Sequence, residues 1–215
     1  MLAGDPRVSS PRRVASVSRL PQAFYARDAL EVAGELLGMV LVRGGVALRI
    51  TEVEAYRSGD TASHCRFGRT ARNAPMWGPG GHVYVYLCYG VHQMLNIVTG
   101  AEGEGAAVLV RACEPVRGLP TIRARRGGLE GPALLTGPGK VGAALAIDTS
   151  FSGHALFCAG GLEVWRGSPP DVVLEGARIG VDYARPADRD APWRLAAGDS
   201  VWISHRARLR PRRRP

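Results

Sequence analysis

The 215-residue chain is 46% hydrophobic and 22% charged, which fits one well-packed globular domain and excludes a wholly disordered or fibrous protein. Lysine and arginine total 28 against 19 acidic residues, and this net charge of +9 is common in proteins that bind a polyanion. Lys140 is the only lysine, so a coding bias toward arginine explains the same excess and leaves other partners open.

The cysteines and the hydropathy of the chain bear on its compartment. Cys65, Cys88, Cys113 and Cys158 are too far apart for a C-x-x-C metal site, and no secretory leader precedes them. No stretch approaches the roughly 18 apolar residues that span a bilayer. We therefore expect reduced thiols in a soluble cytoplasmic protein with no membrane partner, and the arginine-rich, lysine-poor composition favours a bacterial one.

Residues 1–20 are rich in Ser, Pro and Arg and lack apolar periodicity, so we expect a flexible basic arm. A short amphipathic helix is predicted after it. Asp28 and Glu31 have the spacing of a capping box, and Gly38 is a suitable C-terminal stop. The apolar face of this helix consists of Leu30, Ala33 and Leu37.

A β-hairpin is predicted next. Residues 39–43 are apolar and partly β-branched, Gly44-Gly45 suits a two-residue primed turn, and residues 46–56 alternate as extended chain. Successive side chains of a strand point to opposite sides of a sheet. One face of the second strand is therefore expected to carry Ile50, Glu52, Glu54 and Tyr56.

The segment 58–81 is polar, Gly-rich and basic, with neither helical nor strand periodicity. A long loop inside a compact domain is usually functional. The segment 82–88 that follows alternates, with Tyr84 and Tyr86 on one side and its valines on the other. This pattern predicts a half-buried strand.

Further strands are predicted at 94–98 and 106–113, a helix at 138–147, and later strands at 162–165, 178–181 and 201–204. These elements favour an α+β fold, a single compact domain with a curved antiparallel β-sheet surrounded by helices and long loops. The last ten residues hold six arginines, so 206–215 is expected to be an arginine-rich tail that is unfolded in isolation and acts as an electrostatic tether.

Several polar and aromatic side chains interrupt the apolar strands and are candidates for a site. Taken one by one, they have ordinary structural explanations, because a strand carboxylate usually faces solvent or an arginine and alternating tyrosines usually pack in a core or interface. The candidates are Glu52, Glu54, Tyr56, His64, Tyr84, Tyr86, Tyr89, Asn96 and Arg111.

The order of these groups resembles the alkyladenine (3-methyladenine) DNA glycosylase family. E-V-E-A-Y is followed by a distal His, by Y-V-Y-L-C-Y-G-V-H-Q-M-L-N-I-V and by V-L-V-R-A-C-E-P. The resemblance continues through G-P-G-K at 137–140 and R-I-G-V at 178–181, and it runs from about residue 21 to residue 205. Several multi-residue motifs in the same order make it specific.

The resemblance implies that residues 21–205 form a DNA glycosylase domain of base excision repair. Its expected partner is double-stranded DNA that contains a damaged purine, of the class of 3-methyladenine, 7-methylguanine, hypoxanthine and ethenoadenine. The base is flipped out of the duplex and its N-glycosidic bond is hydrolysed, which leaves an abasic site. No cofactor is expected, and the protein is expected to act as a monomer in the cytoplasm, associated with the bacterial nucleoid.

The family's general base corresponds to Glu54, and its partner in holding the nucleophilic water corresponds to Arg111. Hydrolysis of a purine nucleoside passes through a cation-like sugar, and a carboxylate beside that sugar can accept a water proton and stabilise the charge. We therefore expect Glu54 to face a cavity lined by Tyr56 and Tyr86. Glu52 is the alternative base, and its ordinary role is a structural salt bridge.

Recognition of the base follows from the same resemblance. The flipped base is expected to stack between Tyr56, His64 and Tyr86, where an electron-poor alkylated purine gains cation–π attraction. Tyr89 corresponds to the wedge that fills the gap in the duplex. Asn96 corresponds to the residue that obstructs the guanine 2-amino group, and its alternative role is a local backbone hydrogen bond.

Basic residues of two segments are expected to contact the DNA backbone. Lys140 follows Gly-Pro-Gly at a helix start, where free N–H groups and a cation can bind a phosphate. Its alternative is a Schiff-base nucleophile, which the family's direct use of water argues against. Arg66, Arg69 and Arg72 of the long loop are expected to bind phosphates as a group.

One departure from the family concerns His64, because eight positions separate it from Tyr56, one fewer than in the vertebrate members.

Two other classes of protein stay open from the sequence. A noncatalytic damaged-DNA-binding protein would share the basic groove and the aromatic pocket, but it gains little from a carboxylate that faces a polyanion. A metalloenzyme would use His64, Cys65, Cys88 and His92, yet segment 88–92 has the pattern of strand and turn, so no metal is expected.

Overall fold

The structure is a computed structural model that describes residues 18–212. Within this range nine strands form one sheet in the order β3-β4-β5-β2-β8-β7-β9, with β1 paired to β2 and β6 paired to β1. Every neighbouring pair is antiparallel. The strands are β1 (Val40–Arg43), β2 (Val46–Tyr56), β3 (Val83–Cys88), β4 (His92–Thr99), β5 (Ala106–Arg117), β6 (Leu162–Trp165), β7 (Val173–Gly176), β8 (Arg194–Ala197) and β9 (Arg210–Pro211).

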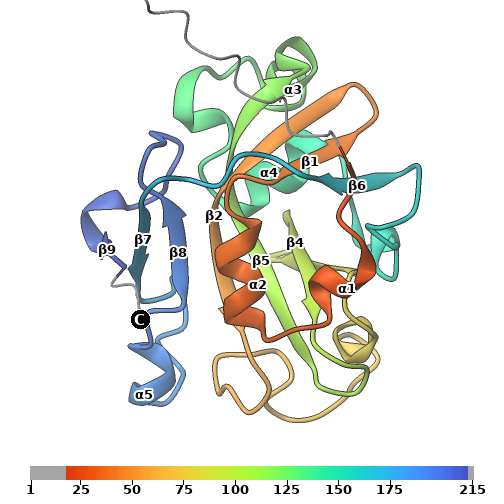
Figure 1. Cartoon of the computed structure of the whole chain (residues 1–215), viewed down its shortest axis with the longest axis vertical. Coiled ribbons are helices and arrows are strands. Elements are labelled where there is room, and N and C mark those ends of the chain that lie inside the picture. The colour runs from red at the N-terminus through yellow and green to blue at the C-terminus, as the bar shows by residue number, and fades with distance from the viewer. Residues whose placement is uncertain (1–17, 213–215) are drawn as a thin grey trace, which may run out of the picture.

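Short helices surround this sheet, and none in residues 18–212 is long and apolar enough to cross a bilayer. The α-helices are α1 (Gln22–Tyr25), α2 (Ala29–Leu36), α3 (Leu119–Arg125), α4 (Pro138–Leu145) and α5 (Pro186–Arg189). Four 3₁₀ turns are η1 (Ala74–Trp77), η2 (Gly131–Leu134), η3 (Thr149–Phe151) and η4 (Arg206–Arg208). Figure 1 shows β7, β8 and β9 on one side of β2, and β4 and β5 on the other. The predicted α+β fold with an antiparallel sheet is confirmed.

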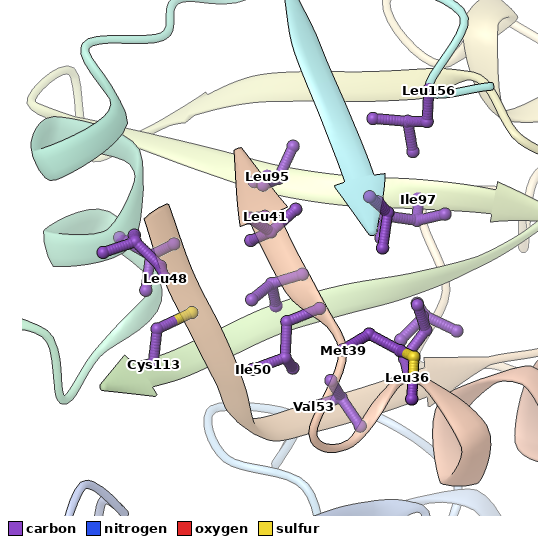
Figure 2. Packing of buried hydrophobic residues seen from close by; sticks show 14 of the residues in the cluster. Leu36, Met39, Leu41, Leu48, Ile50, Val53, Leu95, Ile97, Cys113 and Leu156 are labelled. Carbon is purple, nitrogen blue, oxygen red and sulfur yellow. The ribbon is translucent and has the colours of Figure 1, made fainter. Parts of the chain in front are cut away.

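The main hydrophobic core lies between one face of the sheet and the helices. Leu36 of α2 and Leu145 of α4 are fully buried in it together with residues of the central strands. Figure 2 shows part of this cluster, in which Leu36 and Met39 lie near Val53. Asp28 begins α2 as predicted, because its side chain accepts a 2.9 Å hydrogen bond from the backbone N–H of Leu30. The helix is therefore fixed at its start and by its buried face.

The central strands β2 and β5 each carry one extra residue at the same place. Between Ile50 and Glu52 the pairing advances by two residues on β2 and by one on β5, and between Glu52 and Val53 it advances the other way. The extra residues are Thr51 on β2 and Arg111 on β5. Two opposed β-bulges thus restore the register after locally disrupting it.

These bulges decide which side chains share a face. Ile50 and Val53, three positions apart, both lie in the main core, as Figure 2 shows. The prediction that Ile50 shares a face with Glu52 and Glu54 is wrong, because strict alternation does not continue through an extra residue. The two carboxylates lie on the face opposite the core, beside Arg111.

Most predicted elements are confirmed by β1 to β6, α2 and α4. Two expected strands are wrong, because 178–181 and 201–204 are loops and the strands of this region are β7 and β8. In both loops polar groups bind buried carboxylates in place of a strand partner. Arg178 donates to Asp60, and Ser204 donates to Glu52. Neither α3 nor the short β9 was predicted.

The end of the expected N-terminal arm belongs to the fold. Arg19 forms an isolated β-bridge with Trp165, and Leu20 is buried in the main core. Burial of an apolar side chain offsets the entropy lost by ordering its backbone. The arm is therefore shorter than 1–20, and its residues 1–17 lie outside the described part of the chain.

The expected C-terminal tail is also partly folded. Arg210–Pro211 pairs with β7, and the guanidinium of Arg206 donates to the carbonyls of Ser200 and Gly198 at 2.9 and 2.8 Å. Glu175 forms ion pairs with two further arginines of this segment. These partners offset the repulsion between like charges, so residues 206–212 are ordered where they contact the rest of the domain. Whether the tail is unfolded in isolation stays a prediction.

Leu36→Ala should lower the free energy of unfolding by about 2–5 kcal/mol, because it leaves a cavity between α2 and the sheet. Urea denaturation followed by circular dichroism measures the change. Val201→Ala is the control, since Val201 is 73% exposed and its truncation should change stability by at most about 0.5 kcal/mol. Equal effects of the two substitutions would contradict the buried position of α2.

Candidate active site

A cavity of about 480 Å³ opens beside the bulged part of β2 and β5. Its walls come from the β3–β4 hairpin, from β5, from the loop after β2 and from residues 179–183. This volume is in the range of small-ligand sites. The predicted site residues in the lining are Tyr56, His64, Arg72, Tyr86, Tyr89, Asn96 and Arg111.

Glu54 lies directly behind this lining. Its Oε1 accepts a 2.8 Å hydrogen bond from the backbone N–H of Ile179, and its Oε2 accepts one of 3.0 Å from the hydroxyl of Tyr56. Nη1 of Arg111 lies 3.2 Å from the same Oε2. These three partners line the cavity, whereas Glu54 has 0% exposed surface and is not part of the lining. The expectation that Glu54 faces the cavity openly is therefore wrong for this conformation.

Glu52 is also fully buried and is held by more donors than Glu54. Its Oε1 accepts hydrogen bonds from Nε of Arg111 at 3.1 Å, Nη1 of Arg194 at 3.2 Å and Oγ of Ser204 at 2.8 Å. Its Oε2 accepts a bond of 2.6 Å from the backbone N–H of Ser204. A carboxylate with four donors has little capacity left for a water, so the geometry fits the structural role for Glu52.

Arg111 joins the two carboxylates through different nitrogens. Burial opposes the charge of its guanidinium, but the negative charges of Glu54 and Glu52 outweigh this effect and raise the pKa of Arg111. Arg194 supplies a second buried cation, and its Nε donates to the carbonyl of Ala177 at 3.0 Å. The cluster thus pairs two carboxylates with two guanidinium groups, as buried charges require.

Tyr56 is fixed on the far side of its ring by a buried arginine. The guanidinium carbon of Arg178 lies 4.7 Å from the ring centroid, and Arg178 forms an ion pair with Asp60 and donates to the carbonyl of Ala55. Burial, and then the charge of Glu54, raises the pKa of Tyr56 well above its ordinary value. The hydroxyl therefore stays protonated and donates to Glu54.

His64 and two tyrosines form an aromatic wall of the cavity. Nδ1 of His64 is hydrogen-bonded to the hydroxyl of Tyr84 at 3.0 Å, and its ring centroid lies 4.4 Å from that of Tyr86 with an interplanar angle of 65°. Burial, together with the charges of Arg72 and Arg66, lowers the pKa of His64 to about 4. His64 is therefore neutral at neutral pH.

Asn96 lies in the lining and is held by its own strand neighbourhood. Its Nδ2 donates to the carbonyl of Tyr84 at 3.2 Å and to that of Met94 at 3.1 Å. The alternative role predicted for Asn96, a local backbone hydrogen bond, is thus present in the structure. A side chain fixed in this way places an amide group at a defined position in the cavity wall.

Tyr89 forms the tip of the β3–β4 hairpin. It has a φ of +50° and is followed by Gly90 with a φ of +70°, which turns the chain within three residues. Its side chain is 92% exposed, and Leu87 and Val91 beside it are exposed as well. The hairpin thus presents an apolar tip next to the cavity, of which the sequence indicated only the tyrosine.

The predicted phosphate-binding residues do not all lie at the cavity, and only Arg72 is part of its lining. The guanidinium carbon of Arg72 lies 5.8 Å from the ring centroid of Tyr86 and faces the cavity. Arg66 and Arg69 are exposed on the same loop but outside the lining, and Lys140 lies in the first turn of α4. Among residues 18–212, no group of three His, Cys, Asp or Glu side chains has the arrangement of a metal site.

Sequence reasoning missed several residues that hold the site together. Arg194 and Arg178 are buried arginines. Arg178 begins the R-I-G-V motif, which indicated no role for it, and Arg194 had no signal beyond its apolar neighbours. Ser204 lies 152 residues from Glu52 and has no signal at all. The contribution of Ile179 is a backbone N–H, which no side-chain pattern encodes.

Comparison with known proteins gives the family of this chain. Residues 23–201 match the family model of methylpurine-DNA glycosylase. A Nitrosococcus oceani protein named "Putative 3-methyladenine DNA glycosylase" is 62% identical over 194 residues, which are 90% of this chain and 96% of that protein. The Arabidopsis thaliana protein named "DNA-3-methyladenine glycosylase" is 54% identical over 187 residues, 86% of this chain and 74% of that protein. The chain, whose aromatic cavity and buried acid–arginine pair lie within the matched residues, belongs to the methylpurine-DNA glycosylase family.

Proposed function

We propose that this protein flips a damaged purine out of double-stranded DNA into the aromatic cavity and hydrolyses its N-glycosidic bond with a water activated by Glu54. Membership of the family makes the chain a hydrolytic DNA glycosylase that acts on alkylated bases. The finer proposal is that it is monofunctional and monomeric. Its substrates include 3-methyladenine, 7-methylguanine, hypoxanthine and ethenoadenine, and it leaves an abasic site in an intact strand.

One observation carries this proposal. A cavity with tyrosine and histidine side chains in its walls has a carboxylate directly behind it, bonded to an arginine and a tyrosine of those walls. Aromatic walls suit a flat base, and a carboxylate next to the sugar suits both proton abstraction from water and stabilisation of a cation-like transition state. A protein that only binds DNA gains nothing from a buried negative charge at this place.

Catalysis by Glu54 requires one movement. Its Oε2 is covered by the hydroxyl of Tyr56, whose ring is also a wall for the base. In the proposal, entry of the base shifts this hydroxyl away and opens Oε2 to a water. Catalytic hydrogen bonds often form only once substrate is bound, so the covered carboxylate of the free enzyme is compatible with this role. Arg111 places a positive charge next to the carboxylate and holds the water.

Recognition in this proposal depends on the uncharged aromatic side chains of the cavity wall. His64 is neutral and the tyrosine hydroxyls stay protonated, so a cationic alkylated purine meets π faces and no opposing charge from His64. Asn96, held rigid by two carbonyls, obstructs the 2-amino group of guanine. Tyr89 fills the gap in the duplex, while Lys140 and the loop arginines bind phosphates.

Glu54→Gln should slow base release by about 100- to 10,000-fold while binding of lesion DNA persists, because the amide cannot accept the water proton. The measurement is release of hypoxanthine from a duplex oligonucleotide in EDTA under single-turnover conditions, with binding followed by fluorescence anisotropy. Wild-type release from Glu54→Gln would show that another group is the base. A borohydride-trapped covalent adduct would instead identify Lys140 as a nucleophile.

Glu52→Gln is the matched control, since it makes the same change two residues away on the same face. Removing the charge of this carboxylate leaves Arg194 without its ion-pair partner, so stability should fall by about 3–5 kcal/mol. The folded fraction, measured below its unfolding transition, should still release the base. A folded Glu52→Gln variant that is as slow as Glu54→Gln would mean that the proposed base is the wrong carboxylate.

His64→Gln should remove a pH dependence of stability. The pKa of His64 is about 4 in the folded protein and about 6.5 in the unfolded chain, so the unfolded state binds the proton first. Stability supported by neutral His64 is complete above pH 6.5 and is lost as the pH falls toward 4. Between pH 7 and pH 4.5 the wild type should lose about 2–3 kcal/mol more than the variant in urea denaturation. Parallel pH profiles would contradict a half-buried His64 that is neutral in the folded protein.

A further inference from the structure

An exposed phenylalanine ends a stack of three side chains that leads outward from the cavity. The guanidinium carbon of Arg66 lies 4.8 Å from the ring centroid of Tyr183 and 4.6 Å from that of Phe67. Tyr183 lines the cavity, whereas Phe67 lies outside it. Phe67 is 83% exposed and Tyr183 is 58% exposed, so the stack presents aromatic surface to solvent.

The loop that carries Phe67 is held at both of its ends. Nδ2 of the buried Asn73 donates to the carbonyl of His64 and to that of Gly68, both at 2.9 Å, and so spans Phe67. Gly68 has a φ of +87°, and its N–H donates to the carbonyl of Cys65. The exposure of Phe67 is therefore built into a tightly bonded turn.

The other members of the stack are also fixed. The hydroxyl of Tyr183 donates to the carbonyl of Ala62 at 2.7 Å, and Nη1 of Arg66 donates to the carbonyl of Ser63 at 3.2 Å. Each ring thus meets a guanidinium whose position is set by the backbone beneath it. A large apolar side chain that is held outward in this way indicates a binding surface, since exposing it to water has a cost.

The charge around the stack indicates what binds there. Arg66, Arg69 and Arg72 of the same loop are exposed, and Arg72 also lines the cavity. An exposed aromatic ring among arginines suits a nucleobase whose phosphates are bound on either side. A protein partner with an acidic face would use the arginines but would not need a flat ring.

We propose that Phe67, held by Arg66 and Tyr183, is a second stacking platform, and that it binds a nucleobase of the DNA strand that flanks the flipped nucleotide. The proposal rests on the proposed function, because it places DNA across the mouth of the cavity. Flipping one nucleotide breaks the stacking of its neighbours, and a fixed ring outside the cavity compensates for this loss. The platform thus contributes to binding of the opened duplex and has no part in the chemical step.

Phe67→Ala should weaken binding to a duplex with a tetrahydrofuran abasic analogue by about 5- to 100-fold, and Phe67→Trp should restore it. Single-turnover release of hypoxanthine at saturating enzyme should stay at the wild-type rate in both variants. Val172→Ala, which truncates an exposed apolar residue elsewhere, is the control and should bind as the wild type does. A change in the release rate with unchanged affinity would overturn the platform.

A 2-aminopurine placed at each nucleotide that flanks the abasic analogue locates the contact. Its fluorescence should be quenched by the wild type and by Phe67→Trp at one flanking position, and this quenching should be lost in Phe67→Ala. Equal affinity and equal fluorescence in all variants would overturn the inference. That result leaves base release by the wild type intact, whereas absence of release from every lesion would overturn the proposed function itself.

Discussion

The site depends on a single guanidinium that is shared between two buried carboxylates. Arg111 binds Glu52 through Nε and Glu54 through Nη1. An unpaired buried carboxylate costs several kcal/mol, and Arg111 is the cation paired with Glu54, whereas Glu52 also has Arg194. Through Arg111 the two carboxylates are held on the same face of the sheet, with Glu54 next to the cavity. A carboxylate next to the cavity thus keeps negative charge, which a cation-like sugar needs beside it.

Two buried arginines that lie outside the cavity lining, Arg194 and Arg178, position the groups that bind Glu54. Arg194 binds both Glu52 and the carbonyl of Ala177, two residues before the N–H that donates to Glu54. Arg178 holds the ring of Tyr56 in the same way. These groups never touch the cavity, yet they restrict where the carboxylate can move, and such preorganisation lowers the reorganisation needed during reaction. The Tyr56 hydroxyl covers Oε2 of Glu54, and the ring that carries it lines the cavity.

Alternation along the sequence predicted β1 to β6, because it is a local property. The family resemblance indicated the aromatic cavity residues and Arg111 as the partner of Glu54. It did not predict that Glu54 is covered, since burial depends on loop 178–181, which is 125 residues away in the chain. Strict alternation failed at Thr51, where a bulge moves Ile50 into the core. Ser204 and Arg194 donate hydrogen bonds to Glu52 from distant segments of the chain, and no local sequence pattern predicts such contacts. Bulges and long-range hydrogen bonds are tertiary features, which period-2 patterns cannot encode.

Because β2 and β5 carry opposed bulges, the number of residues in each strand decides which face its side chains occupy. Loss of either extra residue would reverse every side chain that follows, so that valines would face DNA and glutamates would enter the hydrocarbon interior. A one-residue insertion or deletion in either strand should therefore disturb the fold more than a substitution does. Changes in length are more easily accommodated in the loops around the cavity, whose backbones pair with no neighbouring strand.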